Sequence, residues 1–134
     1  MVRRYKDKIS GPLLDRIDLQ VQVNSIPSSD LVDNHKKGES SALVRARVIR
    51  ARSIQLSRQG KVNSQLTASE VKKYCVLGPT EKQLITAAID RLHLSGRAYH
   101  RVLKVARTIA DLKNDANLSP QHLAEALGYR FGQE

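Results

Sequence analysis

The sequence has little of what would indicate a disulfide scaffold, a zinc site or a membrane protein. It holds a single cysteine, Cys75, which excludes an internal disulfide and any zinc cluster built from several thiolates. No apolar run approaches the ~20 residues that a membrane span requires. We therefore expect a soluble protein of a reducing compartment, the cytoplasm, with no membrane partner. Aromatic residues are also scarce at 4%, which leaves few rings on which bases could stack.

Acidic residues are few as well, with 13 Asp and Glu against 23 Lys and Arg and a formal charge of +10. Such an excess favours acidic partners such as DNA, RNA or nucleotide phosphates, but it does not indicate a fold. The length of 134 residues suits one small domain and is short for a two-domain enzyme.

The chain divides near Gly38 into two parts that differ in their pattern of apolar and polar residues. In residues 17–23 apolar and polar side chains alternate, a period of two that predicts a half-buried strand. The run Ser10-Gly11-Pro12 before it predicts a short turn of helix, and a polar linker follows, with one helical turn near Leu31.

A lone strand needs neighbours for its backbone groups and its apolar face, and the sequence offers no second good strand. Either the strand pairs in a dimer, or its sheet lies in residues outside this chain. We favour the second alternative and expect the C-terminal part of a larger protein. In isolation, residues 1–37 should then be mobile or irregular, because they bury too little apolar surface.

Residues 38–134 have helical patterns and predict a small, mainly α bundle of about five helices. Residues 40–59 lack glycine and proline, and Val102 to Ala110 carry the clearest apolar stripe. The predicted helix boundaries are capping boxes at 67–70 and 80–83, a cap at Ser95, a Ser119-Pro120 start and a Gly128 end.

Three separated motifs resemble one known family. The run from Tyr5 to Leu19, with Ser10-Gly11-Pro12 and Asp15-Arg16-Ile17-Asp18, resembles the end of the AAA+ core in magnesium-chelatase-like ATPases. The segments 39–48 and 95–112 look like the bacterial ComM (YifB) branch of that family. The resemblance implies a cytoplasmic, ring-forming ATPase, and in the ComM branch a DNA branch-migration helicase used in natural transformation.

The sequence departs from the family in one respect. It contains no G-x-x-x-x-G-K-[ST] phosphate loop and no acidic Walker B strand. We therefore expect residues 1–37 to be the end of an AAA+ core and residues 38–134 to be its helical lid. ATP and Mg²⁺ would act in the full-length parent, with none expected for this part alone, and its partners would be its own core and neighbouring subunits of a ring.

The resemblance places two arginines at the nucleotide. Arg16 matches the family's arginine finger, which enters a neighbouring subunit's site and neutralises charge on the γ-phosphate. Otherwise, Arg16 would form a surface pair with Asp15 or Asp18. Arg97 matches the sensor 2 arginine at the start of a lid helix, where a cation would otherwise oppose the helix dipole. The alternative for Arg97 is a solvated side chain.

Basic residues also recur on two helix faces, where they could follow a phosphate backbone. The candidates for contact with DNA are Arg47, Arg50, Arg58, Arg101 and Lys104. Charged faces are usually only solvated, so this prediction stays open. Arg45 and Arg52 interrupt the apolar side of their helix, which predicts buried pairing or a subunit interface.

The remaining candidates favour structural roles. The four histidines, His35, His93, His100 and His122, show no metal-ligand spacing, and Cys75 is expected to be a small buried hydrophobe. Two rival functions remain, a free-standing basic DNA-binding module and a structural oligomerisation domain without phosphate chemistry.

Overall fold

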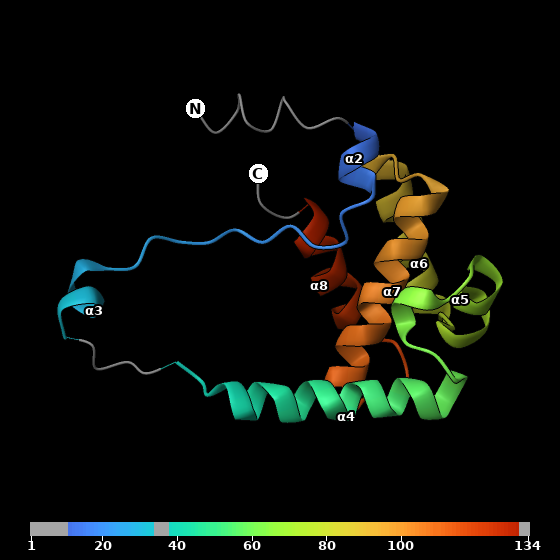
Figure 1. Ribbon diagram of the computed structural model, residues 1–134. Coiled ribbons are helices and arrows are strands. Elements are labelled where there is room, and N and C mark those ends of the chain that lie inside the picture. Colours follow the sequence, from blue (N-terminus) through green and yellow to red (C-terminus); the bar gives the residue numbers. More distant parts are fainter. Residues whose placement is uncertain (1–10, 34–37, 132–134) are drawn as a thin grey trace.

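The computed structural model describes residues 11–33 and 38–131, which fold mainly as α-helices (Figure 1). In chain order these are α2 (Gly11–Asp15), α3 (Ser28–Asp33), α4 (Ser41–Gln59), the 3-10 helix η1 (Asn63–Gln65), α5 (Ala68–Tyr74), α6 (Pro79–Leu92), α7 (Gly96–Leu112) and α8 (Pro120–Phe131). Helices α4 to α8 form the bundle, which confirms the predicted mainly α fold. None of the described helices combines the length and the apolar character that a membrane crossing requires.

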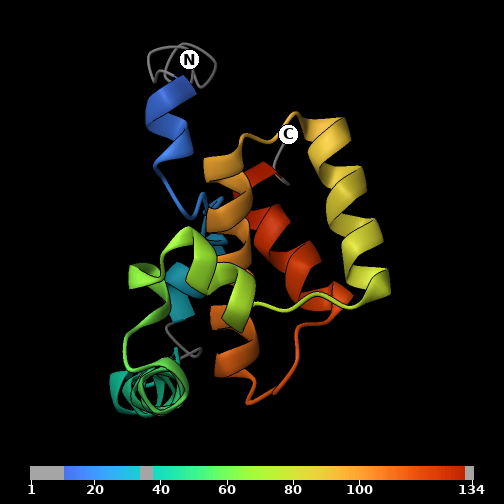
Figure 2. The same cartoon turned by 90° about the vertical axis from the view of Figure 1, so that its right-hand side faces the viewer.

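Helix α7 is the central helix of the bundle, with α8, α4 and α5 packed against it. The Ser95 hydroxyl accepts a hydrogen bond from the Ala98 N–H at 3.1 Å, so the predicted cap is confirmed. The predicted apolar stripe is confirmed too, and all of its members are buried: Val102, Leu103, Ala106, Ile109 and Ala110. In Figure 2, α6 (yellow) stands at the right of the bundle beside α8 (red), which it contacts.

Helix α4 crosses one end of the bundle, below α7 in Figure 1. Ser40 caps its first turn, and Gly60 ends it in a left-handed conformation with φ of 73°. Its first ten residues, 41–50, are all exposed, and its buried residues are Ala51 and Gln55. Only the second half of α4 is therefore packed into the bundle.

A buried carboxylate joins α4 and η1 to α7. The side chain of Asp111 is fully buried and accepts hydrogen bonds from Arg58 at 2.7 Å, Arg107 at 3.1 Å and Asn63 at 3.0 Å. Burial by itself raises the pKa of Asp111, but the hydrogen bonds from Arg58 and Asn63 and the charges of both arginines outweigh it. The pKa of Asp111 is therefore lowered.

Of the other four predicted helix boundaries, two are correct and two are wrong. The capping box at 67–70 begins α5, with both reciprocal bonds between Thr67 and Glu70. The second box at 80–83 does not form, because α6 begins at Pro79, whose fixed φ suits the first helical position. Helix α8 begins at Pro120 as predicted but continues through Gly128, since its last turn packs against the N-terminal segment.

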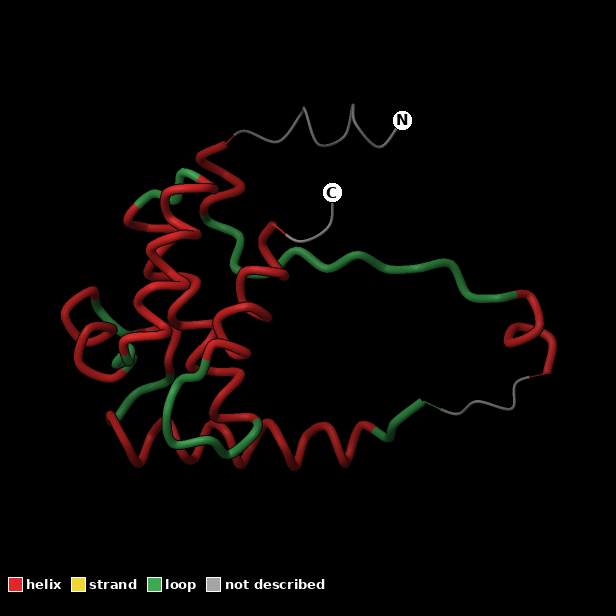
Figure 3. Tube along the Cα trace, turned by 180° about the vertical axis from the view of Figure 1, so that it is seen from behind, coloured by secondary structure: helices red, strands yellow, loops and turns green. Residues whose placement is uncertain are grey.

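The predicted strand over residues 17–23 is wrong. These residues are irregular, and Figure 3 draws the whole connection from α2 to α3 as a loop. In the described ranges, one backbone bond joins this segment to the bundle, from the Gln20 N–H to the Tyr129 carbonyl at 2.5 Å. The described residues hold no second strand to complete a ladder, and in this chain the segment is not a strand.

The short helices predicted near Gly11 and Leu31 are confirmed as α2 and α3, while Ser10 lies outside the described residues. Residues 1–10 and 34–37 also lie outside them, so the predicted mobility of residues 1–37 stays a prediction.

Candidate functional site

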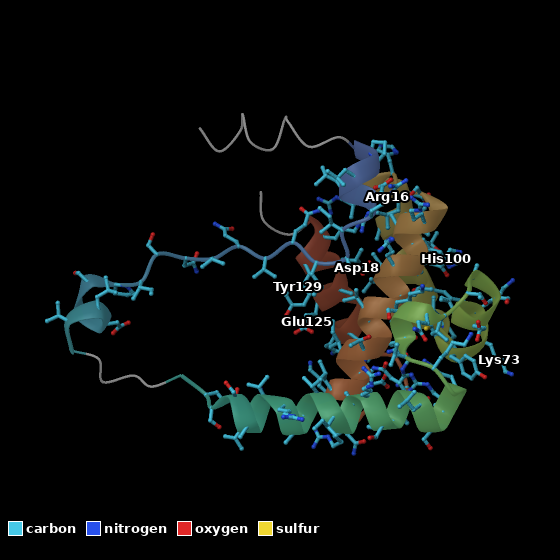
Figure 4. The ribbon with its side chains drawn as sticks, in the orientation of Figure 1. Arg16, Asp18, Lys73, His100, Glu125 and Tyr129 are labelled. Carbon is cyan, nitrogen blue, oxygen red and sulfur yellow. The ribbon has the colours of Figure 1, made fainter. Side chains whose placement is uncertain are left out.

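Arg16 follows α2 directly, and its side chain is exposed. It makes no ion pair or side-chain hydrogen bond with any residue in the described ranges. The carboxylates that could pair with it are taken by bundle arginines, Asp15 by Arg130 at 3.2 Å and Asp18 by Arg101 at 2.5 Å. The surface-pair alternative for Arg16 is therefore not what the structure shows. Figure 4 shows Arg16 at the end of α2 and Asp18 beside α7.

The segment that carries Arg16 is anchored mainly on the last turn of α8. Arg130 donates to the Ile17 carbonyl at 3.0 Å as well as to Asp15, and its side chain is only 3% exposed. The Tyr129 carbonyl accepts the Gln20 N–H. Arg16 thus stands on a fixed segment while its guanidinium remains exposed, an arrangement suited to reaching an anion outside this chain.

Arg97 is the second residue of α7 and is exposed. No described residue forms an ion pair or side-chain hydrogen bond with it. It stands where the free backbone N–H groups of a helix end favour an anion, and where a cation is unfavourable without one. Arg97 and this helix end together form a surface whose charge suits an anion.

A groove of about 860 Å³ runs along the face of α7 that carries Arg97. Its walls come from residues 18–19, η1 and the start of α5, and α8. Four cationic side chains line it, against two carboxylates, those of Asp18 and Glu125. The cations are Arg97, Arg101, Lys104 and Lys113. The floor is apolar, so the groove suits a ligand with anionic groups and an apolar part.

The five residues predicted to contact DNA all have partners within the protein. Arg58 binds Asp111 in the buried cluster, and Arg47 forms an ion pair with Glu39 that lowers the pKa of that carboxyl. The other three partners are the Leu112 carbonyl for Arg50 at 3.1 Å, Asp18 for Arg101 at 2.5 Å and the Ser64 carbonyl for Lys104 at 3.2 Å. Their contact with DNA stays a prediction.

Arg45 and Arg52 are exposed, with no ion pair in the described part of the chain. Their predicted buried pairing is therefore wrong, because the side of α4 that carries them does not face the bundle. The predicted subunit interface stays a prediction.

His122 and Cys75 have the structural roles expected of them and His93 is exposed, whereas the Nδ1 atom of His100 is buried with no hydrogen-bond partner among the described residues. His122 bonds Asp115 at 2.8 Å and Ser119, and His93 ends α6 with a positive φ. Burial raises the pKa of the Cys75 thiol to about 11, so it stays protonated. His35 lies outside the described residues, which hold no group of three metal-ligating side chains.

Sequence reasoning missed the residues that hold the Arg16 segment. Arg130 lies in the last turn of α8, beyond the helix end that was predicted at Gly128. Sequence reasoning also missed Asp111, which joins α4 to α7. It could have been found, because an acid in an apolar stripe, four residues after Arg107, indicates a buried ion pair.

Two family models match the chain. The model described as "Magnesium chelatase, subunit ChlI C-terminal" matches residues 38–130, and the model "Magnesium chelatase, subunit ChlI" matches residues 1–31.

Curated relatives match over nearly the whole chain. The competence protein ComM of Haemophilus influenzae is 45% identical over 129 residues, which is 96% of this chain and 25% of the relative. The uncharacterized protein YifB of Salmonella typhimurium is 46% identical over 127 residues, 95% of this chain and 25% of the relative. The chain thus spans about a quarter of the length of these relatives.

Proposed function

Because the chain belongs to the family of magnesium chelatase ChlI subunits, we propose that it supplies Arg16 and Arg97 to ATP hydrolysis in a longer, ring-forming AAA+ protein. Arg97 acts on the nucleotide of its own subunit, and Arg16 acts on the nucleotide of a neighbour. Catalysis is then divided between subunits, and this chain supplies parts of two sites.

The role of Arg97 is supported by its place on α7. A triphosphate at this helix end would meet the free N–H groups of the first turn together with a guanidinium that no described carboxylate neutralises. ATP with Mg²⁺, when bound, would supply the γ-phosphate that reacts. Arg97 would hold and orient the phosphate chain.

The role of Arg16 is supported by the observation that carries the proposal: both neighbouring carboxylates are paired elsewhere, and no residue in the described ranges binds the guanidinium. An arginine that enters a neighbouring subunit's site needs a fixed backbone and a guanidinium that is not bound by other groups. An arginine finger is worth ~10³–10⁵ in turnover.

The test is ATP turnover in the full-length protein. We expect Arg16→Ala and Arg97→Ala each to lower turnover by at least ~10²-fold, since each removes a charge-assisted contact to the phosphates. Arg91→Ala is the matched control, because Arg91 is an exposed arginine at the end of α6 that lies outside the groove. Unchanged turnover in both site variants would support a structural oligomerisation domain instead.

Mixing the two variants tests the division between subunits. In a head-to-tail ring, a site that has Arg97 from one variant and Arg16 from the other is complete, so random mixing should restore about a quarter of the wild-type sites. If both arginines act within one subunit, no complete site forms and the mixture stays as inactive as either variant.

We further propose that the parent acts on DNA. The support is the similarity to a competence protein and a strongly basic α4, which has five arginines and no acidic residue. The free-standing DNA-binding rival predicts that this chain alone binds duplex or forked DNA with sub-micromolar affinity at physiological salt. Fluorescence anisotropy decides between them, and weak binding would assign DNA contact to the rest of the parent.

A further inference from the structure

The contact between Asp18 and Arg101 differs from the arginine–aspartate contacts that Arg58 and Arg130 make. Arg58 and Arg130 each bind a carboxylate together with another oxygen acceptor, and Arg130 is buried. Arg101 instead gives a single donor, Nη1, to a described acceptor, and its Nε–H is buried without one. The Asp18 carboxylate that it binds is 51% exposed. The guanidinium of Arg101 is therefore held weakly and by one end.

Arg101 also lies beside Arg97. The two residues are four apart on α7, which places them on one face at a separation of about 6 Å along the axis. Both line the same groove, and His100, whose Nδ1 is also buried without a described partner, lines it between them. A phosphate chain that starts at Arg97 and follows the groove meets Arg101 next.

We propose that Arg101 is a second phosphate ligand beside Arg97, and that Asp18 occupies its binding position until a nucleotide polyphosphate displaces it. A planar guanidinium binds two oxygens of a phosphate at once, which is more than the single bond to Asp18. An exposed ion pair contributes little, so displacement is easy. This inference rests on the proposed role of Arg97.

The displacement leaves the segment in place. Arg130 still binds Asp15 and the Ile17 carbonyl, and the Tyr129 carbonyl still holds Gln20. What changes is the link from the Arg16 segment to α7, which is lost when Asp18 is released. Nucleotide binding in one subunit thereby removes one of the contacts that hold the segment next to Arg16. Arg16 is the arginine that this subunit supplies to its neighbour.

The test follows the arginine side-chain Nε–H signals of the 134-residue chain by NMR during titration with inorganic tripolyphosphate at low ionic strength. We expect the Arg97 and Arg101 signals to shift with one shared dissociation constant, while the Arg91 signal stays unchanged. ATP should give the same pattern. A short DNA duplex that shifts both signals at lower concentration than tripolyphosphate would overturn the assignment to a nucleotide.

Two matched variants isolate the competition. Asp18→Asn and Glu125→Gln each remove one negative charge from the groove, but only the first frees Arg101. We expect Asp18→Asn to bind tripolyphosphate about two- to fivefold more tightly and Glu125→Gln to change the affinity less than twofold. Arg101→Ala should bind about tenfold more weakly. A gain in affinity cannot come from a misfolded variant.

The outcomes separate this inference from the proposed function. A shift at Arg97 alone, or equal gains in Asp18→Asn and Glu125→Gln, overturns the role of Arg101 and leaves that of Arg97 intact. Shifts of equal affinity at Arg91 overturn it as non-specific anion binding, and no shift at either groove arginine overturns both roles on α7. The role of Arg16 is tested separately by turnover.

Discussion

The bundle and the N-terminal segment are both held by arginine–aspartate pairs, yet in different surroundings. At the junction of α4 and α7, Asp111 is completely buried and shared by two arginines. On the groove, Asp18 is half exposed and meets one arginine through one bond. Burial makes the first pair part of the framework, because a buried charge that loses its partner has no water to replace it. The second pair can open into solvent at little cost.

The largest expected effect comes from removing Asp111, the buried carboxylate. Asp111→Ala leaves the buried Arg107 and the partly buried Arg58 without their carboxylate and should lower the free energy of unfolding by about 3–5 kcal/mol. Urea denaturation followed by circular dichroism measures this change. Asp90→Ala, an exposed position on α6, is the matched control and should change stability by less than about 0.5 kcal/mol. Equal effects of the two substitutions would show that the cluster does not hold the bundle.

Acid should open the same cluster. The pKa of Asp111 is lowered in the folded protein, so its contribution is complete above the pKa of the unfolded chain, ~3.9, and is lost as pH falls through the folded value. Thermal unfolding between pH 6 and pH 2 should therefore show a stability loss that is smaller in Asp111→Asn. A variant with the wild-type pH dependence would assign the acid sensitivity to other carboxylates.

The anchor on α8 should give an intermediate effect. Arg130→Met keeps most of the side-chain volume but leaves the Ile17 carbonyl and Asp15 without their donor, at a cost of about 1–3 kcal/mol. Amide hydrogen exchange should speed up at Gln20, whose N–H bonds the same helix turn, and stay unchanged at Val105 in α7. Arg91→Ala provides the control for removing an arginine. Unaltered exchange at Gln20 would place the anchor elsewhere.

The cap at the start of α5 provides a third kind of contact. It is exposed, like the Asp18–Arg101 pair, but it joins residues only three apart in the sequence. Thr67→Ala removes the hydroxyl that accepts the Glu70 N–H and should cost ~1 kcal/mol. Ser69→Ala in the same turn does not remove that acceptor and should cost less. If the two variants are equally stable by urea denaturation, the reciprocal cap does not contribute.

The smallest effect is expected on the exposed side. Asp18→Asn should change the free energy of unfolding by less than about 1 kcal/mol, although it breaks the contact between the segment and α7. The same urea denaturation measures it. A loss as large as that of Asp111→Ala would abolish the distinction between the two pairs.

The elements that could be predicted from the sequence are those fixed by local chemistry. Ser95 and Thr67 bond the backbone of the turn that follows them, so their caps are independent of the rest of the fold. The stripe on α7 was equally clear, because every apolar member lies on one face.

The wrong predictions concern residues whose structure depends on distant contacts. The alternation in residues 17–23 indicated a strand, but no neighbour in the described chain completes it. Gly128 indicated a helix end, but contacts of Tyr129 and Arg130 with the N-terminal segment extend α8. For the candidate site, sequence resemblance alone singled out Arg16 and Arg97. The partners of Asp15 and Asp18, more than eighty residues away, required the folded chain.

The uneven packing of α4 has a mechanical consequence. Its second half is held by the Arg58–Asp111 contact and Arg50 bonds the Leu112 carbonyl, while residues 41–49 extend past the bundle (Figure 1). The distance along the axis from Arg50 back to Ser41 is about 14 Å, so a tilt of about 10° at Arg50 moves the free tip by about 2 Å. The first part of α4 is thus a projecting arm held at one end. A small rearrangement under α7 moves the far end of this arm, where the chain enters the helix at Ser40.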